Sequence, residues 1–281
     1  MSLKCSAYRW LRKVYNEHPR LQPLLRGLNR ATFRMQPPSN PTFSGWGMTT
    51  VHSLPWESPG DDAFLEAHAR VKAFEYPPAS YTPETLDGLI WRHWFVWWAT
   101  TLSLGSVTDD RDAVLVECGV GNGITTHFAL ARARALRGDR FEAHLYDSWD
   151  TIRPQDLQES EQWLKGTYGD LSLERTLENL RPFSSALKLH PGPIPDSLSE
   201  DTGHPERVNY LFVGINSGKP TLAACEFFWQ RLAPGAVVLF DDYGHPPFQG
   251  VRDAVNSFIA KHPGGIFTAL PTGQALFLNT D

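Results

Sequence analysis

The chain has 281 residues, a net charge of −5 and a hydrophobic fraction of 41%. This length fits one large domain, or a domain with an extension, that buries a sizeable core. Cys5, Cys118 and Cys225 are far apart and lack metal-ligand spacing, so they argue against a disulfide framework and favour a reducing, cytoplasmic compartment. The start of the chain lacks the continuous apolar run of a signal peptide, and no transmembrane segment is expected.

Basic residues are concentrated at the start of the chain. Residues 1–35 contain eight Lys or Arg and one acid, which leaves 18 basic and 30 acidic residues, a net charge of −12, in the remainder. A basic arm on an acidic body is typical of packing on that body or on a second subunit, which predicts a homo-oligomer through this region as one outcome. Contact with an anionic membrane or nucleic acid is the alternative, but nothing else in the sequence favours nucleic acid.

Residues 1–110 are expected to form a helical extension and a lid. Residues 35–60 are rich in Pro, Gly and Ser, and we expect an ordered loop there. An Asp pair at 61–62 can cap a helix, and Pro83 occupies the first position of another. The apolar run 89–104 is too short to span a bilayer, so it predicts a buried helix. Together with the loop, this helix is expected to cover a ligand cleft.

From residue 113 onward, short apolar runs alternate with helical stretches. The predicted strands are 113–119, 142–147, 186–190, 209–215, 237–242, 266–270 and 275–279. Continuous apolar strands that alternate with helices indicate an α/β domain with a mostly parallel sheet covered on both faces. The last two strands are joined by a segment too short for a crossover helix, so they should form an antiparallel hairpin. This domain is predicted to extend over 111–281.

The stretch VECGVGNGITTHF (116–128) places three glycines between a predicted strand and a helix. Glycines at such a turn let the backbone approach a ligand closely, and the helix N-terminus offers unpaired N–H groups. A dinucleotide fingerprint would need glycine at position 124, where the chain has Ile, and the phosphate loop is also absent. The chain instead has an acid followed by three alternating glycines: Glu117, Gly119, Gly121 and Gly123.

A second acid, Asp147, ends the second predicted strand within LYDSWD. A carboxylate at this position can accept two hydrogen bonds from ribose hydroxyls. The glycine turn and this acid therefore fit a nucleoside held across the first two strands, with no phosphate required. For the glycines alone, a tight turn of an ordinary α/β protein is the alternative.

An acid-x-Gly-x-Gly-x-Gly turn, an acid after strand two and a terminal hairpin together resemble a class I S-adenosylmethionine (SAM) methyltransferase with a seven-stranded Rossmann-like sheet. The stretches VECGVGNG, YDSWDTIRP, GPIPDSL (192–198) and LAPGAVVLFDDYG (232–244) are similar to the macrocin O-methyltransferase (TylF/MycF) family over about 110–280. Enzymes of that family methylate sugar hydroxyls on natural products. The resemblance implies that the glycine turn lines the methionine end of SAM and that the acid after strand two holds the ribose. It also implies that Ser148 and Trp149 lie beside the adenosine. The implied cofactor-binding residues are Glu117, Gly119, Gly121, Gly123, Asp147, Ser148 and Trp149.

The same resemblance implies a divalent cation such as Mg²⁺, held by Asp-x-Asp after strand four and Asp-Asp after strand five. Here Gly214 and Asn216 stand at the Asp-x-Asp positions, while Asp241 and Asp242 remain. Two adjacent carboxylates without a third acid make a weak magnesium site. Three interpretations stay open: an enzyme that needs no metal, a weak metal site with an oxygen from Asn216, or a protein that binds SAM without catalysis.

A hydroxyl acceptor must lose its proton near the transition state. Without a metal, the candidate bases are Asp241, Asp242 and His245. His245 is the best-placed titratable group, and the alternative for it is a loop histidine that makes a backbone hydrogen bond. The sequence thus predicts a SAM-dependent O-methyltransferase acting on a hydroxyl of a sugar, a sugar-like natural product or a glycan. The alternative is a non-catalytic or regulatory SAM-binding protein. A nicotinamide-dependent short-chain oxidoreductase is disfavoured because the chain lacks the Tyr-x-x-x-Lys pair.

Overall fold

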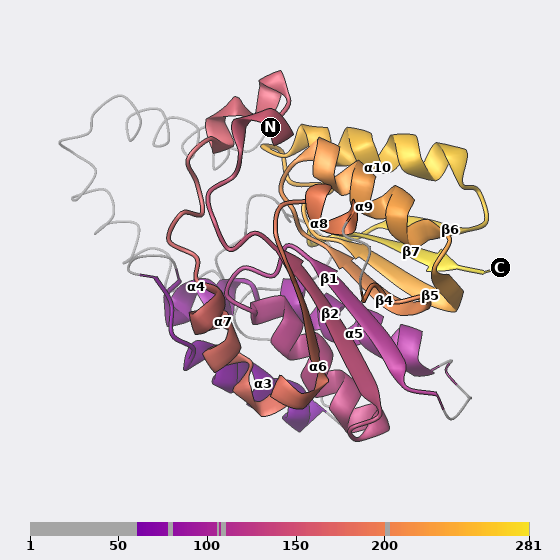
Figure 1. Ribbon diagram of the computed structural model, residues 1–281. Helices are drawn as coiled ribbons and strands as arrows, with labels where there is room; N and C mark the ends of the chain where they lie inside the picture. The colour runs from indigo at the N-terminus through magenta and orange to yellow at the C-terminus, as the bar shows by residue number, and fades with distance from the viewer. Residues whose placement is uncertain (1–60, 78–80, 106, 108–110, 200–202, 281) are drawn as a thin grey trace, which may run out of the picture. The chain divides into compact units, whose positions relative to one another are not determined.

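The computed structural model describes residues 61–280, except 78–80, 106, 108–110 and 200–202. In this part of the chain, seven strands form one sheet in the order β3-β2-β1-β4-β5-β7-β6 (Figure 1). The strands are β1 (Ala113–Cys118), β2 (Phe141–Asp147), β3 (Leu187–Pro191), β4 (Val208–Val213), β5 (Leu232–Phe240), β6 (Gly265–Ala269) and β7 (Ala275–Asn279). The expectations for residues 1–60, namely the basic arm, its subunit contact and the loop at 35–60, lie outside the described residues.

The strand pairing confirms the predicted sheet. The first five strands pair in parallel, and β7 runs antiparallel to both β5 and β6. The largest difference from expectation is β5, which begins at Leu232 instead of residue 237. Its pairing with β4 shifts between Val208 and Tyr210, and Gly235 in the shifted segment has a left-handed φ of 76°. The shift in pairing allows β5 to include the Pro-Gly dipeptide at 234–235, which was expected to precede the strand.

Side chains alternate between the two faces of the sheet and define two cores. One face carries Leu115, Tyr210 and Phe212 and is covered by α3 (Asp61–Lys72), α5 (Ile90–Gly105) and α6 (Ile124–Arg137). The other carries Val116, Leu211 and Phe240 and is covered by α9 (Gly218–Trp229) and α10 (Gln249–Lys261). Figure 1 shows these two groups of helices on opposite sides of the strands. Both faces are apolar because neither faces water, as the continuous hydrophobic runs predict.

The helix expected at 89–104 is α5, and it is buried on one side only, because Trp98 and Leu102 are exposed. His93, Val96 and Trp97 are among its buried residues. Before it, α4 (Pro83–Gly88) begins at the predicted proline, and the Thr82 side chain caps it by accepting the N–H of Thr85. In the described ranges, no helix has both the length and the hydropathy needed to cross a bilayer.

The helices before the sheet belong to the same compact unit as the sheet. This unit spans Pro55–Asp281, and within it α5 packs on β4 and β5. The remaining short helices are α7 (Leu173–Asn179), α8 (Asp196–Ser199), η2 (Pro154–Asp156), η3 (Glu159–Leu164) and η4 (Arg181–Ala186). The position of α5 matters for the site, because its first turn reaches the carboxyl ends of the strands.

Candidate active site

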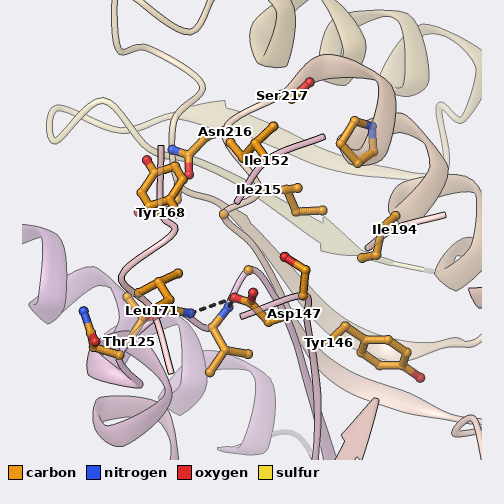
Figure 2. A pocket seen from close by; sticks show the side chains of 18 of the residues that line it. Thr125, Tyr146, Asp147, Ile152, Tyr168, Leu171, Ile194, Ile215, Asn216 and Ser217 are labelled. Atoms are coloured by element: carbon orange, nitrogen blue, oxygen red, sulfur yellow. Dashed lines mark hydrogen bonds between the residues drawn. The ribbon is translucent and has the colours of Figure 1, made fainter. Parts of the chain in front are cut away.

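A cavity of about 540 Å³ opens at the carboxyl ends of β1, β2, β4 and β5. Ligands of open α/β sheets bind at this edge. Six of the predicted site residues line it: Gly119, Gly121, Asp147, Ser148, Asn216 and Asp241. Figure 2 shows Asp147 in the cavity, with Tyr168 and Asn216 toward one end and Tyr146 and Ile194 toward the other. The structure therefore brings the cofactor candidates and the carboxylate candidates to one cavity.

The three glycines of the turn after β1 all have left-handed backbones, with φ of 89° at Gly119, 54° at Gly121 and 81° at Gly123. Residues with a Cβ avoid this region. A Cβ on Gly119 would lie 2.2 Å from the carbonyl oxygen of Gly214, so this glycine also lets the ends of β1 and β4 approach. A Cβ on Gly121 would meet no described atom within 4 Å, and its backbone faces open space. Gly123 is the N-cap of α6, and a Cβ on it would lie 3.0 Å from the side chain of Leu180.

Asp147 holds the glycine turn in place. Its Oδ2 accepts the backbone N–H groups of Val120 at 2.7 Å and Gly121 at 2.8 Å (Figure 2). Its Oδ1 accepts the N–H of Trp149 at 2.7 Å. A carboxylate has about four accepting positions. Three are used within the protein, so one remains for a ligand hydroxyl, where the sequence predicted two hydrogen bonds to ribose.

Trp149 supports the turn from within the protein and does not line the cavity. Its side chain is buried, and its indole N–H donates to the carbonyl oxygen of Gly121 and to Thr176 Oγ1, both at 3.2 Å. Thr176 donates to the same carbonyl at 2.6 Å. The cavity wall expected beside an adenosine is instead formed by Ser148 and, from the segment after β3, by Ile194.

Glu117 is also behind the cavity wall. It is 3% exposed, and its Oε1 accepts the hydroxyl of Thr125 at 2.5 Å. Burial raises the pKa of this carboxyl group to about 8. The raised pKa favours the neutral acid beside the turn. The resemblance implied that Glu117 lines the methionine end of SAM, but this side chain does not line the cavity.

The carboxylates after β5 are paired with Arg92, a residue that the sequence analysis did not assign to the site. Arg92 Nε donates to Asp241 Oδ1 at 2.8 Å, and its Nη2 donates to Asp241 Oδ2 and, at 3.3 Å, to Asp242 Oδ1. Amides complete the cluster: Gln274 Nε2 donates to Asp241 Oδ1 at 3.0 Å, and Asn216 Nδ2 to Asp242 Oδ2 at 2.7 Å. All four carboxylate oxygens therefore have donors from the chain.

Asp242 is the more buried member of the pair, at 3% exposed. Burial first, and then the charge of Asp241, raise its pKa to about 7, against the opposing effect of Arg92. The pKa of Arg92 is raised by the two carboxylates despite its burial, so the guanidinium stays charged. Of the pair, Asp241 lines the cavity and Asp242 lies behind it.

The residues present do not fit the divalent cation that the resemblance implies. The carboxylate oxygens already accept hydrogen bonds, and the described residues contain no cluster of three His, Cys, Asp or Glu suited to a metal. A Cβ on Gly214, where the resemblance expects Asp, would lie 2.8 Å from the ring of Phe212. A third carboxylate at this position would require that ring to move.

His245, like Glu117, Trp149 and Asp242, does not line the cavity. It is exposed, its backbone N–H donates to the carbonyl oxygen of Asp242 at 3.1 Å, and its ring lies against Phe248. This arrangement matches the ordinary loop histidine that the sequence left open. The catalytic role of His245 finds no support in this geometry.

Two tyrosines and an unusual backbone mark the part of the cavity near the carboxylates. Tyr81 and Tyr168 are 38% and 37% exposed and line the cavity beside Arg92. Tyr168 and Asn216 have left-handed φ values of 68° and 64°. Asn tolerates this conformation, but Tyr does so at a cost of about 1–3 kcal/mol, and such residues cluster at functional sites. Neither tyrosine was predictable from the sequence, because no local motif surrounds them.

Comparison with known proteins agrees with this architecture. Residues 116–243 match the family model described as "Methyltransferase domain". The structure of the O-methyltransferase NovP superposes with a TM-score of 0.59 at 19% identity, covering 76% of this chain and 88% of that chain. CalS11, described as a calicheamicin methyltransferase, gives 0.52 at 16% identity, covering 85% and 100%. No curated protein sequence matches the chain at a significant level.

At these identities the solved structures show that the fold is shared. The family model shows that residues 116–243 resemble a methyltransferase domain. The chain therefore contains a methyltransferase domain with the class I fold. The protein is an enzyme of the methyltransferase class.

Proposed function

We propose that the protein is a SAM-dependent O-methyltransferase that acts on a hydroxyl group of a sugar or sugar-like natural product or glycan. The observation that carries this proposal is that one cavity joins the glycine turn and Asp147 to Asp241 and its partners. The first group suits a nucleoside, and the second can handle a hydroxyl proton. The sequence similarity to the macrocin O-methyltransferase family supports the same choice of acceptor.

The glycine turn and the segments after β2 and β3 would hold SAM, whose sulfonium supplies an activated methyl group. Gly119 and Gly121 present backbone without side chains, and the remaining accepting position of Asp147 suits one ribose hydroxyl. Ser148 and Ile194 would lie along the adenosine. Glu117 and Trp149 would keep this surface in shape without touching the ligand, because neither lines the cavity.

The acceptor would bind near Asp241, where Tyr81 and Tyr168 line the cavity. The acceptor oxygen forms the new bond to the methyl carbon, and the electron pair of the broken carbon–sulfur bond stays on sulfur. The hydroxyl proton passes to Asp241, the carboxylate that reaches the cavity. Positioning by the cavity walls supplies much of the remaining acceleration.

The non-catalytic alternative has one observation in its favour. Asp241 and Asp242 already accept hydrogen bonds from Arg92 and the two amides, which lowers their capacity to act as a base. A protein of this kind would bind SAM at the same residues but transfer no methyl group.

Calorimetric titration of the purified protein with S-adenosylhomocysteine, with and without Mg²⁺, tests the cofactor part. The proposal expects binding in the low-micromolar range, on the order of −7 to −8 kcal/mol. Incubation with methyl-labelled SAM and a panel of hydroxylated sugars and glycosides tests transfer. Binding with no labelled product from any acceptor would favour the non-catalytic alternative, and no binding would refute both.

A further inference from the structure

Arg92 is the part of the cavity that the proposed function does not explain. It comes from the first turn of α5, a helix that contains no acidic residue, so it has no carboxylate partner on its own helix. Its side chain reaches instead to Asp241, 149 positions later in the chain. A charged side chain is rarely placed in an apolar helix unless a partner compensates its burial.

The hydrogen bonds of Arg92 leave part of the guanidinium free. This group has five N–H donors in a fixed planar fork. In the described part of the chain, Nε and Nη2 bind the two carboxylates, and the two N–H donors of Nη1 have no partner. The side chain is 26% exposed and lines the cavity, so the oxygen of a ligand in the cavity can approach the guanidinium.

The charges around Arg92 restrict what this ligand can be. The Asp241–Asp242 pair carries up to two negative charges against one fixed positive charge. An anionic group placed here would meet carboxylates without a spare cation, whereas a neutral hydroxyl oxygen can accept from Nη1 without that repulsion. Tyr81 and Tyr168 add aromatic faces with polar tips, which suit a hydroxylated ring.

We propose that the Arg92 guanidinium takes the place that the resemblance gives to a divalent cation, and that its Nη1 donors bind the hydroxyl oxygen of a neutral acceptor. The chain supplies the positive charge of the acceptor site from α5, and the two carboxylates are not available to a metal. Gly214 and Asn216 fit this arrangement: the first lacks a carboxylate, and the second donates to Asp242. The identity of the acceptor rests on the proposed function, but the exclusion of metal does not.

Manganese binding tests the exclusion without any methyl-transfer assay. Paramagnetic resonance of free Mn²⁺ is measured in the presence of wild type, Arg92→Ala, Arg92→Lys and, as a control, Arg252→Ala, whose side chain is exposed on α10. We expect no binding by wild type or by the control below about 1 mM, and at least about tenfold tighter binding by Arg92→Ala. Arg92→Lys should resemble wild type because the ammonium keeps the charge.

Two further measurements make this result decisive. The Mn²⁺ site gained by Arg92→Ala should disappear in the double variant Arg92→Ala/Asp241→Asn. A thermal melt shows whether Arg92→Ala folds, and Arg92→Gln replaces it if it does not. The proposal that Arg92 replaces the metal would be refuted if wild type bound Mn²⁺ through Asp241. It would also be refuted if the neutral Arg92 variants gained no Mn²⁺ binding. These outcomes do not depend on SAM, so they stay distinct from a failure of the proposed function.

Acceptor binding tests the second part of the inference, once an acceptor has been found. Methyl transfer by wild type should be unaffected by EDTA, and Arg92→Lys should raise KM for the acceptor about tenfold or more because the planar fork is lost. The affinity of the Arg92→Lys variant for S-adenosylhomocysteine should stay within about threefold of that of wild type. Inhibition by EDTA that Mg²⁺ restores, or an unchanged acceptor KM, would overturn the assignment.

Discussion

The glycine turn after β1 and the carboxylate pair after β5 border the same cavity, but they are built in different ways. The turn consists of backbone, shaped by left-handed glycines and held by side chains close in sequence, among them Asp147, only 26 positions from Gly121. The carboxylate pair consists of side chains, and its partner Arg92 lies 149 positions away. A change in the turn therefore alters the shape of the wall, whereas a change in the pair alters charge in a wall that keeps its shape.

The largest effect is expected within the glycine turn, at Gly119, where the turn approaches the end of β4. Gly119→Ala combines a left-handed φ of 89° with a Cβ only 2.2 Å from the carbonyl oxygen of Gly214. We expect loss of measurable S-adenosylhomocysteine binding and a loss of stability on the order of 3 kcal/mol. For stability, Gly121→Ala is the matched control, because its Cβ meets open space and only the backbone strain, about 1 kcal/mol, remains. Equal losses of stability in the two variants would show that close approach to β4 is unimportant.

The next effect separates charge from shape. Asp241→Asn keeps the volume of the side chain but removes the carboxylate that reaches the cavity. If the proposed function holds, methyl transfer should fall roughly 10²-fold, while affinity for S-adenosylhomocysteine changes less than about threefold. Calorimetry and a labelled-methyl assay on the same sample provide the comparison. A parallel loss of cofactor binding would show that the two regions are not independent.

A smaller effect is expected at Asp147, which acts on the turn through hydrogen bonds. Asp147→Ala leaves the N–H groups of Val120, Gly121 and Trp149 without their acceptor, although water can reach part of the site. We expect affinity for S-adenosylhomocysteine to fall about tenfold, or about 1.4 kcal/mol. Asp150→Ala, an exposed residue of the same cavity, serves as the control and should change affinity little.

The smallest effect concerns the pH dependence of stability. Burial raises the pKa of Glu117 from 4.5 to about 8, so the folded state retains a proton that the unfolded state has released. This contribution to stability is complete below about pH 4.5 and is lost as pH rises toward 8. Between pH 6 and pH 7 it amounts to about 1 kcal/mol, or roughly 3 °C in Tm.

Glu117→Gln isolates this contribution from that of Asp242, whose raised pKa acts in the same direction. The fall in Tm from pH 6 to pH 7 should be roughly 3 °C smaller in the variant than in wild type. An identical fall in both proteins would mean that Glu117 is ionised in the folded state.

The parts of the fold and site that local sequence determines were predictable. The strands, the terminal hairpin and the glycine turn follow from hydrophobic runs, a short connection and alternating glycines. The partnership of Arg92 with Asp241 was not, because it depends on how α5 packs on β4 and β5. A signal was nevertheless present: a single arginine in an apolar helix without acids requires a distant carboxylate.

Two residues show why proximity to a motif did not predict a role in the cavity. His245 lies three positions after Asp242, but the turn between them directs it to Phe248 at the surface. Trp149 follows Asp147 closely, yet its indole N–H is used beneath the glycine turn. In both cases the local backbone after the strand decides the direction of the side chain, and hydrophobic periodicity carries no information on that direction.

The origin of Arg92 on α5 has a consequence for modular engineering. The domain recognised by its sequence spans residues 116–243, but Arg92 precedes this interval and Gln274 follows it. A chimaera that received only this interval would contain the two carboxylates but would lack Arg92, which balances their charge, and Gln274, which donates a hydrogen bond to Asp241. The transferable unit of this enzyme is therefore larger than its recognisable domain, and it must include the helix in front of the first strand.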